Sequence, residues 1–224
     1  MIKICVSGSE GKMGSRIIDL AKEDPELEVV AGFDVNGNAE LGIEACECLI
    51  DFTAPKATME HLALCEKLKK PIVIGTTGLS EEEKAKIKEA SNHIPVVSSP
   101  NMSVGVNLLF KLIGEASKVL GEDSNVNIVE AHHAEKKDAP SGTAKEIAKI
   151  IKGVKGDIDI PIDSVREGEM IGEHTVTFES DVDLLEITHS AKTRDIFAKG
   201  ALKAAKFVAG KKSGLFTMKD VLAL

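Results

Sequence analysis

The sequence contains no tryptophan and no tyrosine, so the aromatic rings of its 224 residues, histidines apart, are seven phenylalanines. Proteins that bind single-stranded nucleic acid without sequence preference stack the bases on aromatic side chains. Dehydrogenases that use a tyrosine hydroxyl as their acid are excluded outright. Any proton transfer in this protein must therefore use other side chains.

Positive charge is also scarce. Twenty-eight Lys and Arg residues face 36 Asp and Glu residues, which leaves a formal net charge of −8. This balance opposes binding to nucleic acid or to an anionic membrane. An anionic small molecule would need a locally basic pocket.

Neither a disulfide framework nor a long apolar run is present. Cys46 and Cys48 form CxC rather than the CxxC of redox or zinc sites, and Cys5 and Cys65 stand apart, so we expect four structural thiols. No apolar stretch approaches the roughly 18 residues of a membrane span, and the first residues lack the features of a signal peptide. We therefore expect a cytoplasmic protein that binds no membrane.

The first hundred residues alternate short β-rich apolar runs with longer helical patterns, which is typical of a parallel sheet with crossover helices. Strands are predicted at 2–6, 27–33, 48–52, 71–75 and 95–98. Helices are predicted at 13–22, 55–68 and 80–92, the last with a capping box of Ser80 and Glu83.

The pattern changes after Pro100. A long helix over 104–120 precedes the β-rich run NVNIVEAHH, a helix over 141–151 and two alternating runs, HTVTFES and DLLEITHSA, before a last helix over 195–209. We predict an α/β protein with a Rossmann-type doubly wound parallel sheet and a second α+β domain with a mixed sheet. The domain limits are expected at 1–103 with 194–224, and at 104–193.

A glycine turn, Gly8-Ser-Glu-Gly11-Lys-Met-Gly14, stands between the first strand and its helix. Such turns let the backbone approach a pyrophosphate at a helix N-terminus. Asp34 ends the next strand about 20 residues after the last glycine, where a carboxylate would accept hydrogen bonds from a ribose. The spacing is GxxGxxG rather than GxGxxG, and Glu10 must point outward. An ordinary glycine turn with a solvated aspartate is the alternative.

Two further loops follow strands of the same sheet. They are Gly75-Thr76-Thr77-Gly78 and Ser99-Pro100-Asn101-Met102. Doubly wound sheets bind ligands at the carboxyl ends of their strands. Without the glycine turn each would be an ordinary loop, but together with it they are candidates to hold a nicotinamide.

The densest polar cluster is EAHHAEKKDAPSGT, residues 130–143. A helix that begins near Ser141 suits a carboxylate, and a histidine beside Lys136 and Lys137 can donate a proton near neutral pH. A metal site is disfavoured because neighbouring residues on a strand point to opposite faces and no cysteine or third histidine lies nearby in sequence. A purely structural loop is the other alternative.

The chain resembles the 4-hydroxy-tetrahydrodipicolinate reductase (dihydrodipicolinate reductase) family of lysine and diaminopimelate biosynthesis. The matching segments run in order along nearly the whole chain. They are GSEGKMG, IDFT, GTTG, SPNMSVGVN, EAHHAEKKDAPSGTA, GEHTVTF and SGLFTMKDVL. The resemblance implies that hydride passes from NADH or NADPH to a cyclic unsaturated imine dicarboxylate, giving tetrahydrodipicolinate.

The resemblance also assigns residues to roles. It makes His132 and Lys136 the proton donors, and His133, Gly142 and Thr143 the substrate-binding residues. The implied cofactor contacts are Gly8, Ser9, Glu10, Gly11, Lys12, Met13, Asp34, Gly75, Thr76, Thr77, Ser99, Pro100, Asn101 and Met102. No metal is implied.

Two departures from the family pattern bear on the cofactor. Val35 follows the ribose-binding acid where NADPH-using members often have arginine, and Lys12 replaces an arginine common in the glycine turn. A valine beside Asp34 disfavours a 2′-phosphate, which Lys12 partly offsets. We therefore expect NADH to serve at least as well as NADPH. The chain is also shorter than usual between Asp34 and Leu49 and between Gly153 and Val165.

The resemblance further implies that the first domain binds the dinucleotide. The second would bind the substrate and form a homotetramer through its mixed sheet. Two other functions fit the first hundred residues. Another NAD(P)-dependent amino-acid dehydrogenase of similar layout would not explain DAPSGTA. A non-catalytic NAD-binding sensor would not need His132 and Lys136 together.

Overall fold

A computed structural model describes residues 1–121 and 124–224. The chain divides into two compact units, one of residues 1–104 with 195–224 and one of residues 105–194. We call them unit 1 and unit 2. In the described part of the chain, every helix is too short or too polar to cross a membrane.

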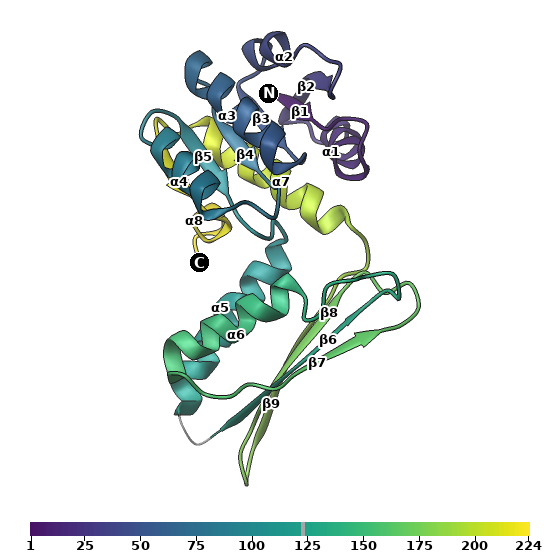
Figure 1. The fold of residues 1–224 in the computed structure, drawn as a ribbon, viewed down its shortest axis with the longest axis vertical. Helices are drawn as coiled ribbons and strands as arrows, with labels where there is room; N and C mark the ends of the chain where they lie inside the picture. Colours follow the sequence, from purple (N-terminus) through teal and green to yellow (C-terminus); the bar gives the residue numbers. More distant parts are fainter. Residues whose placement is uncertain (122–123) are drawn as a thin grey trace. The chain divides into compact units, whose positions relative to one another are not determined.

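Unit 1 is built on a six-stranded sheet in which all paired strands run parallel (Figure 1). The strand order is β10-β5-β4-β3-β1-β2. The strands are β1 (Ile2–Ser7), β2 (Leu27–Phe33), β3 (Cys48–Asp51), β4 (Ile72–Ile74), β5 (Pro95–Ser98) and β10 (Gly214–Phe216). The order reverses at β1, which is the arrangement of a doubly wound sheet, and the predicted fold class is confirmed.

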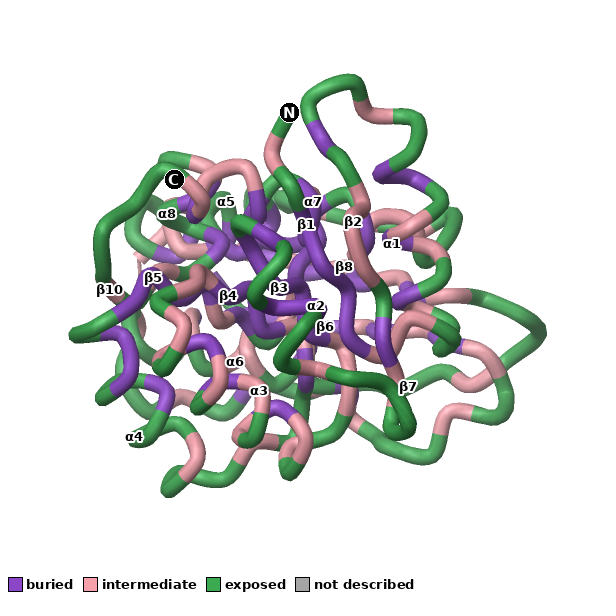
Figure 2. The backbone as a smooth tube through the Cα atoms, turned by 90° about the horizontal axis from the view of Figure 1, so that it is seen from above, coloured by how far each residue is buried: buried purple, intermediate pink, exposed green. Residues whose placement is uncertain are grey.

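The sheet is buried on both faces, which explains the continuous apolar runs of its strands. Alternate residues of β1 enter different cores: Ile4 and Val6 pack on one face, and Cys5 packs on the other. In Figure 2, β1, β3 and β4 are buried along most of their length.

Helices cover both faces of this sheet. They are α1 (Lys12–Lys22), α2 (Ala39–Ala45), α3 (Pro55–Leu68), α4 (Glu81–Ala90), α7 (Asp195–Ala209) and α8 (Met218–Leu222). Apolar residues of α1, α7 and α8 belong to one core, and those of α2, α3 and α4 belong to the other. The predicted capping box of Ser80 and Glu83 is present. Sequence reasoning had not predicted α2 and β10.

Unit 2 is a mixed four-stranded sheet packed against two helices, as predicted. Its elements are α5 (Val104–Leu120), β6 (Asn125–His132), α6 (Gly142–Lys155), β7 (Ile162–Arg166), β8 (Glu173–Glu179) and β9 (Leu184–Ser190). The order is β7-β6-β8-β9, with β7 parallel to β6 and the other pairs antiparallel. The helices contact each other where Gly114 of α5 faces Ile150 of α6 (Figure 1).

The register of unit 2 brings polar residues together. His132 pairs with Arg166 between β6 and β7, and Glu130 pairs with His174 between β6 and β8. Glu130, His132 and His174 share the buried face of the sheet with the apolar core residues Val126 and Ile128.

Candidate active site

The glycine turn of unit 1 has a conformation that requires glycine. Gly8 has φ +73°, and a Cβ on Gly14 would lie 2.0 Å from the carbonyl oxygen of Gly8. Gly11 is the N-cap of α1 and provides no side-chain cap, so the first N–H groups of this helix are not capped by a side chain at that position. The turn is therefore closely packed against its helix, and the helix N-terminus has the donors that an anion would bind.

The turn and Asp34 lie together, as the sequence pattern predicted. Oδ2 of Asp34 accepts hydrogen bonds of 2.8 Å from the hydroxyl of Ser9 and the backbone N–H of Glu10. The side chain of Glu10 is exposed and so points away from the turn. Val35 is 99% exposed, so nothing covers the position next to Asp34.

The two predicted nicotinamide loops follow β4 and β5 at the same edge of the sheet as the glycine turn, since the strands are parallel. Thr76 is buried, Thr77 is exposed, and Gly75 lies against the ring of Phe52. In the second loop, the hydroxyl of Ser99 donates to the carbonyl oxygen of Asn101. Pro100 is exposed at the tip of this loop.

Met102 is buried beside α7. A Cβ on Gly200 of this helix would lie 1.7 Å from the carbonyl oxygen of Met102, so the close packing of α7 against the loop depends on glycine at position 200. Sequence reasoning missed Gly200, because a glycine inside a helical pattern has no local signature of such a contact.

A buried aspartate that sequence reasoning did not assign to the site joins these loops. Asp51 is fully buried at the end of β3, and its Oδ1 accepts from the backbone N–H of Thr53 and from the hydroxyl of Thr76. Its Oδ2 lies 2.7 Å from Nδ1 of His61 on α3. The polar residues of the IDFT segment were the available signal, but the partner His61 was not predicted.

In unit 2, His132 ends β6 with its ring enclosed. Its Nδ1 lies 2.5 Å from Oε2 of Glu130, which is fully buried on the same face of the strand. A Cβ on Gly172 would lie 2.9 Å from Nε2, so glycine makes room for the ring there. Because Glu130 accepts from Nδ1, Nε2 is the ring nitrogen left for proton transfer.

Arg166 of β7 holds Glu130 from the other side. Its NH1 donates to Oε2 over 2.9 Å and its NH2 donates to Oε1 over 2.6 Å, which is a bidentate pair. Burial raises the pKa of Glu130, but the hydrogen bonds from Arg166 and its other partners outweigh burial and bring this pKa to about 2. Glu130 is therefore an anion at neutral pH.

The predicted lysine lies on the loop after β6. Nζ of Lys136 binds both carboxylate oxygens of Asp138, over 2.7 and 2.9 Å, and its side chain is 22% exposed. Its ammonium group holds the pKa of Asp138 below the ordinary value. Lys137 is exposed. Further along the loop, the Ala139–Pro140 peptide bond is cis.

The predicted substrate residues lie at both ends of this loop. Gly142 and Thr143 begin α6, whose N-cap Ser141 accepts from the N–H of Ala144, and a Cβ on Gly142 would meet open space. His133 follows β6, is half-buried, and donates its backbone N–H to the carbonyl oxygen of Met170. The loop after β6 and the first turn of α6 thus carry every residue predicted to bind the substrate.

His174 of β8 completes the network, because its Nε2 lies 2.9 Å from the hydroxyl of Ser141 and its ring stands edge-on to that of His132. Ligand-type atoms of Glu130, His132 and His174 lie within 4.8 Å of one another. Arg166 already contacts both oxygens of Glu130, so a metal cation would have to compete with a guanidinium group. The geometry favours a hydrogen-bond network.

His174 predicts acid sensitivity of the fold. Burial, together with the nearby His132, lowers the pKa of His174 to about 4, so the unfolded chain binds a proton more readily between about pH 6.5 and pH 4. The free energy of unfolding should therefore fall as the pH falls through this window, by a few kcal/mol at most, on the order of 1.4 kcal/mol per unit. Denaturant unfolding over this range, with wild type and His174→Asn, measures it.

The variant should lose stability less steeply on acidification than the wild type. His93→Asn is the control, because His93 is about half exposed and pairs with Glu66 elsewhere in the chain. Parallel pH dependence in all three proteins would exclude His174 as the source.

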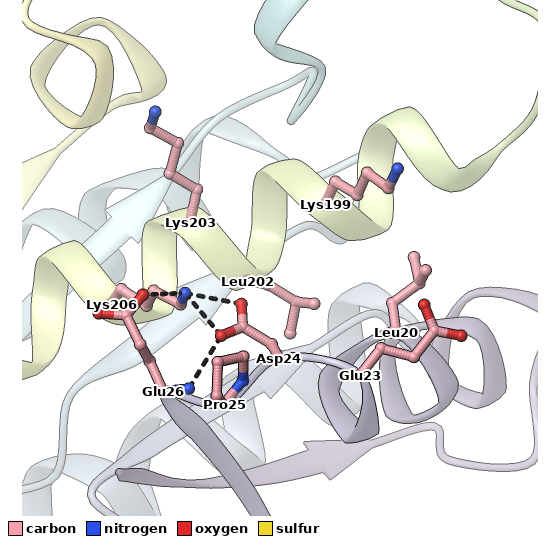
Figure 3. Close-up of a pocket in the computed structure, with 9 residues that line it drawn as sticks. All are labelled: Leu20, Glu23, Asp24, Pro25, Glu26, Lys199, Leu202, Lys203 and Lys206. Atoms are coloured by element: carbon pink, nitrogen blue, oxygen red, sulfur yellow. Dashed lines mark hydrogen bonds and ion pairs between the residues drawn. The ribbon is translucent and has the colours of Figure 1, made fainter.

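A broad cleft of about 790 Å³ lies elsewhere on unit 1, between the α1–β2 turn and α7 (Figure 3). Lys206 in this cleft is bound by Asp24 and Glu26, and the carboxylates precede β2 at the amino end of that strand. Ligands of doubly wound sheets bind at the carboxyl ends of the strands. This cleft is therefore not the cofactor site.

The sequence matches two family models in succession. Residues 2–102 match "Dihydrodipicolinate reductase, N-terminus", and residues 105–222 match "Dihydrodipicolinate reductase, C-terminus". The chain belongs to the dihydrodipicolinate reductase family. This confirms the resemblance drawn from the sequence motifs.

Curated relatives that match the chain over its whole length support the same family. The 4-hydroxy-tetrahydrodipicolinate reductases of Geobacter sp. (strain M21) and Citrifermentans bemidjiense are each 41% identical to this chain, with all of both chains covered. The family activity is the NAD(P)H-dependent reduction of the cyclic imine dicarboxylate in lysine and diaminopimelate biosynthesis. The predicted enzyme class and reaction are confirmed.

Solved structures place the fold in the same family. A dipicolinate-bound dihydrodipicolinate reductase from Paenisporosarcina sp. TG-14 matches with a TM-score of 0.88 and 25% identity, covering 99% of this chain and 100% of that chain. An aspartate dehydrogenase from Thermotoga maritima matches with a TM-score of 0.54 and 14% identity, over 94% of this chain and 98% of that one. The second likeness shows the fold alone.

Proposed function

We propose that unit 1 of this reductase binds NADH or NADPH, that unit 2 binds the dicarboxylate substrate, and that His132 and Lys136 supply the protons. One observation supports this assignment above the others. The loop from β6 to α6 carries a buried imidazole held at Nδ1, a lysine, and a helix N-terminus. A reduction that adds hydride to an electron-poor imine needs a proton donor and fixed partners for two carboxylates.

The glycine turn fits a dinucleotide. Its two closest-packed glycines leave no room for a side chain, the first turn of α1 has no side-chain cap, and Asp34 is fixed to the turn through one oxygen. We assign the pyrophosphate to residues 8–13, the ribose to Asp34, and the nicotinamide to the loops 75–77 and 99–102. The cofactor supplies the hydride.

The loop residues of unit 2 have separate tasks in this proposal. The N–H groups of Gly142 and Thr143, at the positive end of the α6 dipole, would bind one substrate carboxylate with help from His133. Lys136 would approach the other carboxylate or donate a proton. His132 would donate from Nε2 to the charge that develops after hydride arrives. The dipicolinate in the Paenisporosarcina structure is a dicarboxylate too, which supports this substrate class.

The test is a direct assay. Purified protein is mixed with the aldol product of pyruvate and aspartate semialdehyde, and oxidation of NADH and of NADPH is followed by absorbance. We expect oxidation with either cofactor. Because the chain has no tryptophan or tyrosine, the signal of bound reduced nicotinamide also stands out in titrations without substrate. Failure to oxidise both cofactors would contradict the proposal.

Cofactor choice provides a second prediction. We propose that kcat/KM with NADH at least equals that with NADPH, because exposed Val35 offers no cation to a 2′-phosphate. Val35→Arg should raise kcat/KM for NADPH relative to NADH by roughly 10- to 100-fold, as a charge-assisted hydrogen bond contributes about 1.5–3 kcal/mol. Steady-state kinetics with both cofactors measure the ratio.

Val182→Arg is the matched control, since Val182 is 94% exposed in the β8–β9 turn and gains the same charge away from the glycine turn. Its cofactor ratio should equal that of the wild type. A strong NADPH preference in the wild type would contradict our interpretation of Val35.

We further propose a homotetramer formed through the mixed sheet, in the cytoplasm. The edge strand β9 and the outer face of this sheet expose Leu184, Leu185 and Val165, which supports an interface there. The four cysteines are free and buried, which fits a reducing compartment. Light scattering of the purified protein tests the subunit number.

A further inference from the structure

We propose that Glu130 and Arg166 are positioning residues, which fix the imidazole of His132 and the loop that carries Lys136. This inference rests on the proposed roles of those two residues. Neither Glu130 nor Arg166 is among the groups predicted to contact substrate or cofactor. Their contribution would be to the orientation and protonation of the groups that do.

Hydrogen bonds to both oxygens fix the orientation of the Glu130 carboxylate. Its two oxygens receive four contacts: Arg166 reaches both, the backbone N–H of Ser141 donates to Oε1, and Nδ1 of His132 lies against Oε2. Glu130 is fully buried, so water does not compete for these oxygens. A carboxylate fixed on two sides fixes the plane and the tautomer of the ring that it contacts.

The same guanidinium group reaches the lysine loop. NH2 of Arg166 also donates to the carbonyl oxygen of Asp138 over 2.7 Å, and the carboxylate of Asp138 holds Nζ of Lys136. A continuous series of hydrogen bonds therefore links His132 to Lys136 through Glu130, Arg166 and Asp138. One arginine connects both proposed proton donors.

The charges around His132 decide what loss of Glu130 would do. The titratable and charged groups that face its ring are Glu130 on the same strand, Arg166 from β7, His174 from β8 and Lys136 from the loop. Burial lowers the pKa of His132, and Lys136 and Arg166 lower it further, whereas Glu130 raises it. Glu130 is the anion in this set, so it favours the protonated ring that can donate from Nε2.

Glu130→Gln is the first test, because it keeps the size of the side chain and removes its charge. The limb of the pH–kcat profile that reports protonated His132 should move to lower pH by about one unit. At neutral pH kcat should fall about tenfold, while the Kd of reduced nicotinamide stays within twofold. Arg166→Lys keeps the positive charge but loses the bidentate pair with Glu130, and it should move the pH limb in the same direction by a smaller amount.

An NMR titration of the His132 ring provides a readout that needs no activity, with its signals assigned by loss in His132→Asn. The His132 pKa should fall in Glu130→Gln and should not change in Glu66→Gln, the control at the exposed Glu66–His93 pair. If Glu130→Gln does not fold, the double variant Glu130→Gln/Arg166→Met, which buries no unpaired charge, replaces it; the His132 pKa should then fall by less, because removing Arg166 also removes a charge that lowers this pKa.

An unchanged His132 titration together with an unchanged pH limb would overturn the inference. If the wild type oxidises neither NADH nor NADPH but the His132 pKa still falls in Glu130→Gln, the proposed function is refuted and the positioning of the ring by Glu130 stands. If Glu130→Gln loses kcat and cofactor affinity to the same extent, the substitution damages the protein generally, and this result would also overturn the inference about Glu130.

Discussion

Replacing Lys136 with alanine is expected to lower kcat by about 10²- to 10⁴-fold, the usual range for losing a positioned acid or base. In our proposal the lysine would also bring positive charge to a dicarboxylate in a protein of net charge −8, so KM for the substrate should rise as well. The Kd for NADH should change little, because the proposed cofactor residues lie in unit 1 and Lys136 lies in unit 2. Steady-state kinetics measure kcat and KM, and a fluorescence titration with NADH measures the Kd of the cofactor.

Lys137→Ala is the neighbouring control, since it removes the same charge from an exposed side chain one residue away. It should retain most of the wild-type kcat. A loss in Lys137→Ala as large as that in Lys136→Ala would assign the effect to the overall charge of the loop. A matching loss of NADH affinity in Lys136→Ala would contradict the role that we assign to it.

Gly14→Ala is expected to have the largest effect on unit 1. The added Cβ would lie 2.0 Å from the carbonyl oxygen of Gly8 and 2.9 Å from Cα of Ser9, and both are backbone atoms that cannot rotate away. Overpacking of this kind costs about 1–3 kcal/mol or more. Because relief requires the turn to open, we also expect NADH affinity to fall by at least about tenfold, on the order of 1.4 kcal/mol. Thermal unfolding and NADH titration test both expectations.

Gly153→Ala provides the comparison, because it makes the same substitution in α6 at an exposed position where the new Cβ meets nothing within 4 Å. There alanine should stabilise the helix by up to about 1 kcal/mol. Equal destabilisation by the two substitutions would mean that the contact with Gly8 is not the cause.

Elements with strong local signals were predictable from the sequence. The helices Pro55–Leu68, Val104–Leu120 and Asp195–Ala209 have the predicted bounds, since each has a continuous apolar face over several turns. The short elements α2 and β10 were missed. Helix α2 has seven residues, too few for a periodic pattern to be recognised. Strand β10 is as short as β4, but it lies at the edge of the sheet and lacks the fully buried apolar run that made β4 predictable.

The site divides in the same way. Gly8, Asp34, His132 and Lys136 could be proposed from the sequence because each belongs to a compact motif, and their roles remain predictions. Arg166 was missed because its partner Glu130 lies 36 residues away, and only the parallel pairing of β6 with β7 brings them together. His61 and Gly200 were missed because each lies inside a helical pattern, which does not show what the residue contacts. Long-range partners of buried polar groups depend on strand register, which local sequence does not reveal.

The division of unit 1 between two distant segments of chain has a consequence for biosynthesis. Ala198, Ala201 and Val208 of α7 are fully buried in the core that covers one face of the parallel sheet. A nascent chain emerges from its N-terminus, and domains fold largely as they become complete. The first 104 residues therefore leave the ribosome with only α1 on this face of their sheet, and the apolar surface that α7 and α8 cover in the folded unit stays open to chaperones or to aggregation until 195–224 has been synthesised. Unit 2, whose residues are continuous, has its whole core available earlier.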